Sequence, residues 1–275
     1  MFQQPLVRNC LSVASMGLVL SSCAPPSEEQ VIALKDCGAV SVNGMFALTI
    51  EQHPVSQLQL TVPLSALDHL RIEKKGNGDK GTRDKGNRDE GKEVKGSGEQ
   101  SLASKTTGLS IHSAADTQIT GKLHCQQLTS LHLTGPSEVV VGAQLAMLED
   151  VRLYGNSAAN ISKIFVEESS VRASASASLN VESIDADKLS VAAGGESQVA
   201  LAGEVAQARM EAVGNAQLDA WELSVQHLEL RCIGNSKVVV APSAHLTGKA
   251  LGSCAVANVG GGDVSLSVED QATLD

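Results

Sequence analysis

Aromatic residues are scarce in this sequence: its 275 residues include one Trp, one Tyr and three Phe. Proline is also infrequent, with seven residues, whereas glycine is abundant, with 25. The apolar fraction of 42% is still ample for a core. That core must therefore be built from Leu, Val, Ile and Ala, which suits a stack of thin layers that each need only small aliphatic side chains.

A net positive charge is also absent. Lys and Arg total 21 against 31 Asp and Glu, which gives a formal net charge of -10 at pH 7. This balance makes nucleic acid or an anionic membrane surface an unfavourable partner. Sustained helical periodicity is missing too, because the short helix-like patterns at residues 145–151 and 221–230 fall where the repeat described below requires a strand or a corner. The sequence therefore predicts an all-β protein.

The N-terminal segment has the character of a targeting signal. Arg8 is its only charge, and the apolar stretch of residues 11–20 is too short for a permanent membrane span. The segment ends in the tetrapeptide LSSC, which closes at Cys23 and resembles the lipobox of bacterial lipoproteins. The resemblance implies a signal peptide of residues 1–22, cleavage before Cys23 and acylation of that cysteine. The alternative is an ordinary secretory signal with a chance cysteine.

Residues 23–30 form a polar stretch that we interpret as a tether between the lipidated cysteine and the fold. Ala24, rather than an Asp, follows Cys23, and by analogy with lipoprotein sorting this favours the outer membrane. The expected partner of this end of the chain is therefore a membrane, held through the lipid on Cys23.

A charged, glycine-rich insert interrupts the predicted domain of residues 31–275. Residues 74–105 are almost devoid of apolar side chains and carry charges of both signs, with the near-repeats DKGTR, DKGNR and DEGKE. Such a segment cannot offset the entropy of ordering it, so we predict a disordered loop. The alternatives are cation binding by its carboxylates or polyanion binding by its basic residues. Strand-like patterns at residues 31–73 and from 109 onward indicate that the insert lies within a single domain.

A glycine turn recurs along the C-terminal half. The stretch HLELRCIGNSKVVV (227–240) has alternating apolar positions, a turn at Gly234 and a second apolar run. Comparable turns precede it at Gly214, Gly195, Gly155 and Gly135. One coil lacks the glycine, and there VRASASASLNVESI (171–184) places small residues at the turn. A fixed period of this size predicts a solenoid. Residues 109–268 leave room for roughly eight coils, or a rod on the order of 35–40 Å long at about 4.8 Å per coil.

Asn156, Asn215 and Asn235 directly follow turn glycines. We interpret them as structural residues. Asparagine tolerates a left-handed backbone, and amides stacked on successive coils can satisfy one another's hydrogen bonds.

Four cysteines remain after the targeting segment and Cys23: Cys37, Cys125, Cys232 and Cys254. In an oxidising compartment they permit two disulfides in any of three pairings. Cys232 and Cys254 lie about one repeat apart, but they occupy different positions relative to their turn glycines, which argues against that pair. Buried free thiols are an equal alternative.

The order of the strand motifs is distinctive. Residues 40–50 read VSVNGMFALTI, followed by an L-x-V strand at 60–62, a leucine-bearing segment at 67–72 and an L-x-I strand at 109–111. Repeated glycine turns come next. This order resembles the bacterial auto-transporter adhesin, head GIN domain family, over about residues 37–268, with a departure at the insert. The resemblance implies a right-handed parallel β-helix on a secreted or lipid-anchored envelope protein.

Catalysis is one candidate function, because parallel β-helices also host polysaccharide lyases and glycoside hydrolases. Such sites need paired carboxylates, or an acid cluster with a basic partner, on one face of successive coils. Asp185 and Asp187 share strand parity, but the neighbouring coil places Glu204 or Gln207 beside them, with no Arg or Lys in evidence. We therefore predict no catalytic residue.

Sugar binding favours exposed aromatic platforms. Tyr154 and Trp221 are the available rings, and they lie three repeats apart. We interpret the single tryptophan as a corner or core residue of its coil.

A metal site is a further candidate. His112 and His132 face outward by strand alternation and lie one repeat apart, so they could stack on adjacent coils, with His124 and Cys125 nearby in sequence. Nothing supplies a firm third ligand. Surface histidines are the favoured interpretation, and no metal or cofactor is predicted.

These patterns together predict a lipid-anchored, non-catalytic envelope protein with an adhesin-like or structural role. Its β-helix surface would present itself to a protein or glycan partner. The alternative is a polysaccharide-processing β-helix enzyme or a glycan-binding protein.

Overall fold

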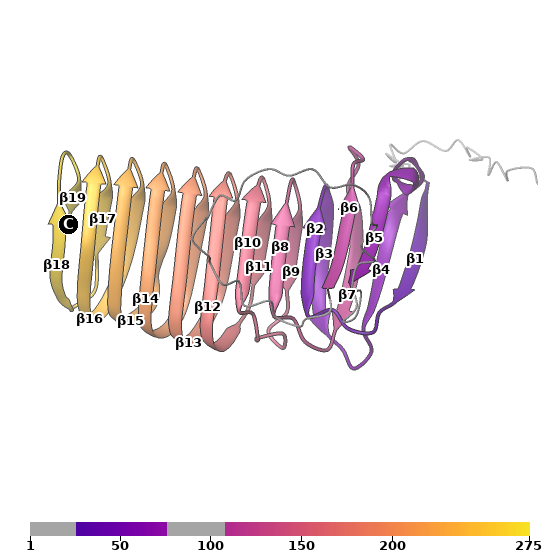
Figure 1. Ribbon diagram of the computed structural model, residues 1–275, viewed down its shortest axis with the longest axis horizontal. Helices are drawn as coiled ribbons and strands as arrows, with labels where there is room; N and C mark the ends of the chain where they lie inside the picture. The colour runs from indigo at the N-terminus through magenta and orange to yellow at the C-terminus, as the bar shows by residue number, and fades with distance from the viewer. Residues whose placement is uncertain (1–25, 76–107) are drawn as a thin grey trace, which may run out of the picture.

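The structure is a computed structural model that describes residues 26–75 and 108–275. It is a right-handed parallel β-helix, as predicted, and it has about 7 turns where the sequence left room for roughly eight. Its strands stack into the elongated rod of Figure 1. The predicted signal peptide (1–22), Cys23 and most of the predicted disordered insert (74–105) lie outside the described residues. No helix in the described part of the chain is long and apolar enough to cross a membrane.

The described residues form strands β1 to β19 and one short 3-10 helix, η1. Up to the first strands after the insert, the elements are β1 (Ser27–Ala33), β2 (Ala39–Asn43), β3 (Phe46–Gln52), β4 (Gln57–Pro63), η1 (Leu64–His69), β5 (Leu70–Lys75), β6 (Gly108–Ser113) and β7 (Ile119–Cys125). The remaining strands are β8 (Ser130–Thr134), β9 (Glu138–Val141), β10 (Asp150–Gly155), β11 (Ala158–Ile161), β12 (Ile164–Ala175), β13 (Ser178–Gly195), β14 (Gln198–Gly214), β15 (Gln217–Gly234), β16 (Lys237–Gly252), β17 (Ala255–Asn258), β18 (Asp263–Val268) and β19 (Thr273–Leu274).

Successive coils pair in parallel, as shown by Asp150 opposite Ser170 and Ser190 opposite Arg209. Each long strand bends around the rod and ends at the glycine turn. We call the sheet that leads into this turn the pre-turn sheet. Its members are β2, β6, β8, β10, β18 and the second halves of β12 to β16, at residues 168–175, 188–195, 207–214, 227–234 and 245–252.

Alternating side chains of these strands fill the interior. Val151, Val171, Val191, Met210 and Leu230 follow one another on neighbouring coils. Each of them is at most 2% exposed. A layer only one coil thick has room for aliphatic side chains of this size, which accounts for a core that needs few aromatic residues.

The turn repeats in one backbone conformation. Gly155, Gly195, Gly214 and Gly234 all have φ between 72° and 89°. Glycine adopts this left-handed region without steric cost because it lacks a Cβ atom. In the coil without a turn glycine, Ala175 takes the position with φ 63°. The interpretation of this stretch as a turn made by small residues is therefore confirmed.

Ala175→Gly is expected to raise the free energy of unfolding by about 0.5–1 kcal/mol. A left-handed backbone costs an L-residue about 1–2 kcal/mol, and the greater flexibility of glycine in the unfolded chain offsets part of the gain. Urea unfolding followed by circular dichroism measures the change. Ala173→Gly is the matched control, since Ala173 is buried in the same strand and its loss should destabilise the protein. A less stable Ala175→Gly variant would contradict the assignment.

The asparagines that follow the turn glycines differ in whether they bond to one another. Asn235 Nδ2 donates to Asn215 Oδ1 at 2.9 Å, so the predicted amide stacking is confirmed for this pair. Asn156 does not join it, because the coils on either side carry Pro136 and Ser176 at its position. The predicted left-handed asparagine backbone was wrong, since the preceding glycine takes that conformation in each turn.

The first coil of the chain is not the first coil of the rod. Strand β2 pairs with β6 on one side and β8 on the other, and β3 likewise pairs with β7 and β9. The β6–β7 coil therefore lies outside the β2–β3 coil, as Figure 1 shows. Strands β4 and β5 run antiparallel to β7 and β6, and β1 runs antiparallel to β4. These strands and η1 cover the N-terminal end of the rod.

The domain starts earlier than predicted. Residues 27–30, predicted as part of the 23–30 tether, belong to β1, with Ser27 opposite Pro63 and Gln30 opposite Leu60. Their polar sequence SEEQ hid the strand, because an exposed edge strand needs no alternation of buried apolar residues. Lys74 and Lys75, predicted as the start of the insert, end β5 instead.

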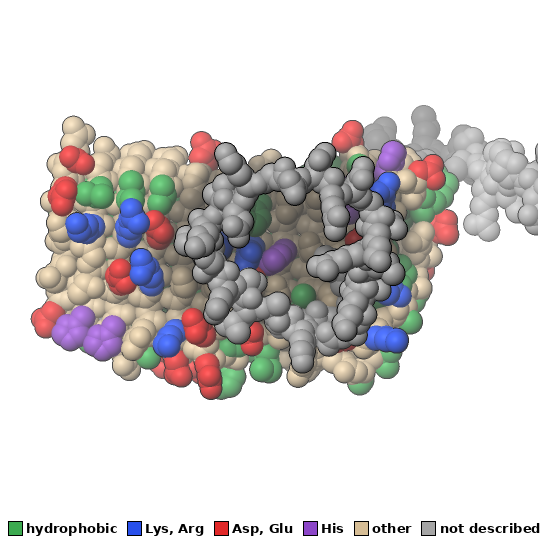
Figure 2. Space-filling model, in the orientation of Figure 1, with side chains coloured by type: hydrophobic (Ala, Val, Ile, Leu, Met, Phe, Trp, Pro, Cys, Tyr) green, Lys and Arg blue, Asp and Glu red, His purple; other side chains and the backbone are tan. Residues whose placement is uncertain are grey.

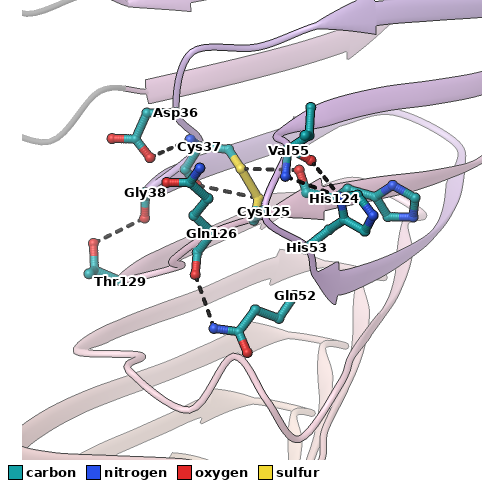
Figure 3. Close-up of a disulfide and its surroundings, with 10 residues drawn as sticks. All are labelled: Asp36, Cys37, Gly38, Gln52, His53, Val55, His124, Cys125, Gln126 and Thr129. Atoms are coloured by element: carbon teal, nitrogen blue, oxygen red, sulfur yellow. Dashed lines mark hydrogen bonds between the residues drawn. A yellow bond between two sulfur atoms is a disulfide. The ribbon is translucent and has the colours of Figure 1, made fainter.

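Two disulfides join coils, Cys37–Cys125 and Cys232–Cys254. Cys37 precedes β2 and Cys125 ends β7, so the first bond ties the β2–β3 coil to the β6–β7 coil that lies outside it (Figure 3). Cys232 and Cys254 lie on opposite sides of the glycine turn on neighbouring coils. Their turn glycines are paired in register, so both side chains enter the same tight corner. In the sequence analysis, the different positions of these cysteines relative to their turn glycines argued against the pair. In the structure, those positions place both cysteines in this corner, where they form the disulfide.

The connection from β7 to β8 must pass the β2–β3 coil. Both the backbone N–H and the hydroxyl of Thr129 donate to the Gly38 carbonyl oxygen, at 2.7 and 3.0 Å. The Gln126 side-chain amide donates to the Pro54 carbonyl at 2.6 Å. Figure 3 shows Gly38, Gln126 and Thr129 grouped around the Cys37–Cys125 bond. The crossing is therefore held by hydrogen bonds as well as by the disulfide.

Candidate functional site

The outward side chains of the pre-turn sheet form straight rows along the rod. This follows from parallel stacking, because each outward position lies directly beside its counterpart on the next coil. One row is Arg152, Arg172, Ala192, Glu211, Arg231 and Lys249; a second is Asp150, Ser170, Ser190, Arg209, Glu229 and Thr247; a third is Glu168, Lys188, Gln207, His227, His245 and Asp263.

These rows contain most of the positive charge of the solenoid. Of the Lys and Arg residues from 108 to 275, only Lys122, Lys163 and Lys237 lie elsewhere. A chain with a net charge of -10 thus gathers basic side chains on a single face. Figure 2 views this face and shows basic and acidic groups interspersed towards its C-terminal end. The three rows hold six basic and five acidic side chains, an arrangement that suits an extended partner of mixed charge.

Ion pairs on this face are exposed and loose. Arg209 and Glu229 lie 3.5 Å apart, as do Arg231 and Glu211. Exposed pairs of this kind contribute little to stability, typically about 0–1 kcal/mol. Their charged groups can therefore exchange these pairs for contacts with a partner at small cost to the fold.

A shallow groove of about 410 Å³ crosses the second and third rows. Its lining combines Lys188, Arg209 and Glu229 with the rings of His227 and His245. These two rings stack with centroids 5.2 Å apart and planes inclined by 14°. Beyond them, the next coil contributes Asp263, whose Oδ2 lies 3.9 Å from His245 Nδ1. The groove offers donors and acceptors along the rod axis.

A tighter cluster occupies the opposite end of the same sheet. Asp150 Oδ2 lies 2.9 Å from His132 Nε2, and Arg152 Nε donates to Asp150 Oδ1 at 3.0 Å. The carboxylate is about three-quarters buried and holds both neighbours in place. The cluster holds one side chain of β8 and two side chains of β10 in fixed positions. We therefore interpret it as a structural network within the face.

The sequence profile described as "Putative auto-transporter adhesin, head GIN domain" matches residues 120–262, more than half of the 275 residues. The chain belongs to this family. The resemblance drawn from the strand motifs is thereby confirmed. No curated protein matches this head GIN domain protein.

Solved structures share the fold of this head GIN domain. A "putative adhesin" from Parabacteroides merdae has 16% identity and a TM-score of 0.65, covering 90% of this chain and 95% of its own. One from Parabacteroides distasonis has 17% identity and a TM-score of 0.66, covering 91% and 98%. A third, a "putative lipid binding protein" from Parabacteroides distasonis, has 16% identity and a TM-score of 0.64, covering 90% and 95%. At these identities the likeness concerns the fold.

The acids considered for catalysis are dispersed. Asp185 and Asp187 are both exposed. Asp185 lies between Phe165 and Glu204 on the neighbouring coils, so the predicted acidic neighbour is confirmed. No ion pair within residues 26–75 and 108–275 involves either aspartate. The two carboxylates therefore lack the basic partner that a lyase-type site would need.

The stack of His112 on His132 that was considered as a metal site does not form. Strand β2 lies between β6, which carries His112, and β8, which carries His132, so the two rings are not on adjacent coils. His124 instead stacks on His53 with ring centroids 4.9 Å apart (Figure 3), and lies 3.9 Å from Glu51. Among the described residues, no group of three or more His, Cys, Asp and Glu side chains could hold a metal ion.

The two rings considered as sugar platforms are both accessible. Tyr154 is 40% exposed and lies directly before the turn residue Gly155, which ends β10. Trp221 is 57% exposed and lies in β15 where the strand register shifts, which confirms that it is a corner residue.

His227, His245 and Arg209 were not singled out from the sequence. The period of the repeat was the one sequence signal that could have grouped these residues, because residues one coil apart lie in the same row. The coils differ in length, however: Gln198 to Gln217 spans 19 residues, whereas Gln217 to Lys237 spans 20. Rows therefore cannot be assigned until the register is known.

Proposed function

We propose that this protein is a lipid-anchored cell-envelope protein with a non-catalytic, adhesin-like binding role. The pre-turn sheet is its binding face, and the partner is a protein or glycan of mixed charge. The single observation that carries the proposal is the gathering of charged side chains into three rows on the pre-turn sheet, crossed by an open groove and not by an enclosed cleft.

The position of the predicted anchor supports this arrangement. Cys23 precedes Pro26, the first described residue, by three positions, so a lipid on it would lie within about 10 Å of the fold. Strand β1 lies at one end of the rod (Figure 1), and the pre-turn sheet extends away from that end. A membrane-held N-terminus would leave the groove near the C-terminal coils free for a partner.

Cys23→Ala is expected to move the protein from the membrane fraction to the soluble fraction of fractionated cells, because the acyl chains attach to this thiol and the described residues hold no membrane-spanning helix. Cys10→Ala is the matched control, since it removes a cysteine upstream of Cys23 and leaves both the Cys23 thiol and the disulfides of the fold intact. Retention of Cys23→Ala in the membrane would contradict anchoring by a lipid on Cys23. A parent protein that is itself found in the soluble fraction would indicate an ordinary secretory signal.

Exposure on intact cells tests the adhesin-like role separately. Protease added to whole cells should cleave within residues 74–105 if the rod faces outward. A periplasmic scaffold would survive the same treatment and be cut only after the outer membrane is opened. Turnover of acidic polysaccharides that is lost in Asp185→Ala would overturn the non-catalytic assignment in favour of a polysaccharide-processing enzyme.

A further inference from the structure

The single tryptophan of the chain sits on an irregularity of the solenoid. Ala200 pairs with Asp219 and Ala202 with Glu222, so β15 uses three steps where β14 uses two. The extra residue makes a β-bulge, a device that re-aims a side chain and is over-represented next to binding and active sites. Trp221 lies within this bulge with 57% of its surface exposed, and its backbone N–H donates to Asp219 Oδ1 at 3.4 Å.

A hollow of about 260 Å³ opens beside the indole. Its floor is made by Ala200 and Ala202, whose side chains are too short to fill the outward positions of β14. On one side of this floor, β13 contributes Asn180 and Glu182 to the lining. On the other side, β15 contributes Asp219, Glu222 and Trp221. Two alanines between longer side chains thus create a depression one coil wide.

The groups around this depression suit hydroxyl recognition. The carboxylates of Glu182, Asp219 and Glu222 accept hydrogen bonds, and the Asn180 amide both donates and accepts. These residues are exposed and come from two coils, β13 and β15, on either side of β14. They therefore approach a ligand from both sides of the alanine floor, while the indole offers a flat apolar surface.

We propose that this hollow, formed by Trp221, Ala202, Asn180, Glu182, Asp219 and Glu222, binds a neutral pyranose residue of a glycan. The aliphatic C–H face of the sugar stacks on the Trp221 indole, and its hydroxyl groups donate to the carboxylates and exchange hydrogen bonds with Asn180. The hollow lies outside the pre-turn sheet. A test of this proposal is therefore independent of the binding role proposed for the groove and of the lipid anchor.

The charge of the hollow narrows the ligand class. Three carboxylates repel a uronic acid or a sulfated sugar, which excludes acidic glycans from this position. A quaternary ammonium ligand is also attracted by carboxylates and by a π face, but such groups are recognised by several rings arranged as a cage. Trp221 is the one aromatic side chain that lines the described hollow. A neutral pyranose can stack on the Trp221 indole and can also donate hydrogen bonds from its hydroxyl groups to the carboxylates.

Because Trp221 is the single tryptophan, its fluorescence reports directly on the site. Cellobiose, maltose and lactose, together with an array of neutral oligosaccharides, serve as probes; glucuronate and choline serve as charged comparisons. At least one neutral probe should produce a saturable change in emission with an affinity in the millimolar range or better. Ala202→Leu fills the hollow and keeps the fluorophore, so it should weaken that affinity at least tenfold.

Phe165→Ala is the matched control. Phe165 is as exposed as Trp221, at 57%, but does not line the hollow, so its loss should leave the affinity unchanged. Trp221→Ala, measured by calorimetry with the same probe, should abolish binding without a change in the thermal midpoint. The proposal is overturned if no neutral probe binds, if choline alone changes the emission, or if Ala202→Leu binds as tightly as the parent.

Discussion

Cys37→Ala combined with Cys125→Ala is expected to lower the free energy of unfolding by about 4–5 kcal/mol. The bond joins residues 88 positions apart, so its loss releases a long loop in the unfolded chain. Alanine is chosen because both side chains are fully buried, and serine would place a hydroxyl in the core. Urea unfolding of the oxidised protein, followed by circular dichroism, measures the loss.

The second disulfide provides the matched control. Cys232 and Cys254 are 22 positions apart, so Cys232→Ala combined with Cys254→Ala should cost less, about 3 kcal/mol. The difference between the two double variants is the informative quantity, since both remove a buried bond between coils. A variant in which all four cysteines are replaced by alanine should be as unstable as the parent protein after its disulfides have been reduced. Equal losses from the two pairs would show that loop length does not govern their contributions.

Gly248→Ala is expected to lower the free energy of unfolding by about 2–5 kcal/mol. Gly248 has φ 134°, a backbone conformation that residues with a Cβ rarely adopt. A Cβ atom built there falls on the carbonyl group of Leu230 in the neighbouring coil, and backbone must shift to make room. The midpoint of thermal unfolding, followed by far-ultraviolet circular dichroism, should fall accordingly.

Gly194→Ala is the appropriate comparison. Gly194 lies in the same pre-turn sheet, but the nearest atom to an added Cβ is the Ser174 Cβ at 4.0 Å, an ordinary contact. Its substitution should change stability by no more than about 0.5 kcal/mol. A similar loss in both variants would mean that general glycine flexibility, and not the contact with Leu230, sets the cost.

Much of the solenoid could be predicted because its features are local. The turn at Gly214 and Gly234 needs a left-handed residue in every coil, and that requirement leaves glycine at a regular spacing in the sequence. The inward row of Val171, Val191 and Leu230 leaves an alternating apolar pattern for the same reason. Ala175 was also recognisable, because a small residue is the next best occupant of the turn.

The candidate sites were harder to predict because they combine residues from different coils. The groove at His227 and His245 depends on which residues share a row, and coil length varies from one turn to the next. Trp221 stands out in the sequence as the single tryptophan, but its exposure results from the extra residue in β15. Its alanine floor, at Ala200 and Ala202, carries no sequence signal without that register.

The sequence by itself determined the all-β class, the period of the coils, the aliphatic core and the family motifs, because each depends on residues close together in the chain. Only the tertiary structure decided the order of the coils and the disulfide pairing. Placing β2–β3 between β6–β7 and β8–β9 separates His112 from His132 and brings Cys37 to Cys125. Stacking of this kind is set by which sheet edges remain free to pair, and backbone edges have no residue-specific signature.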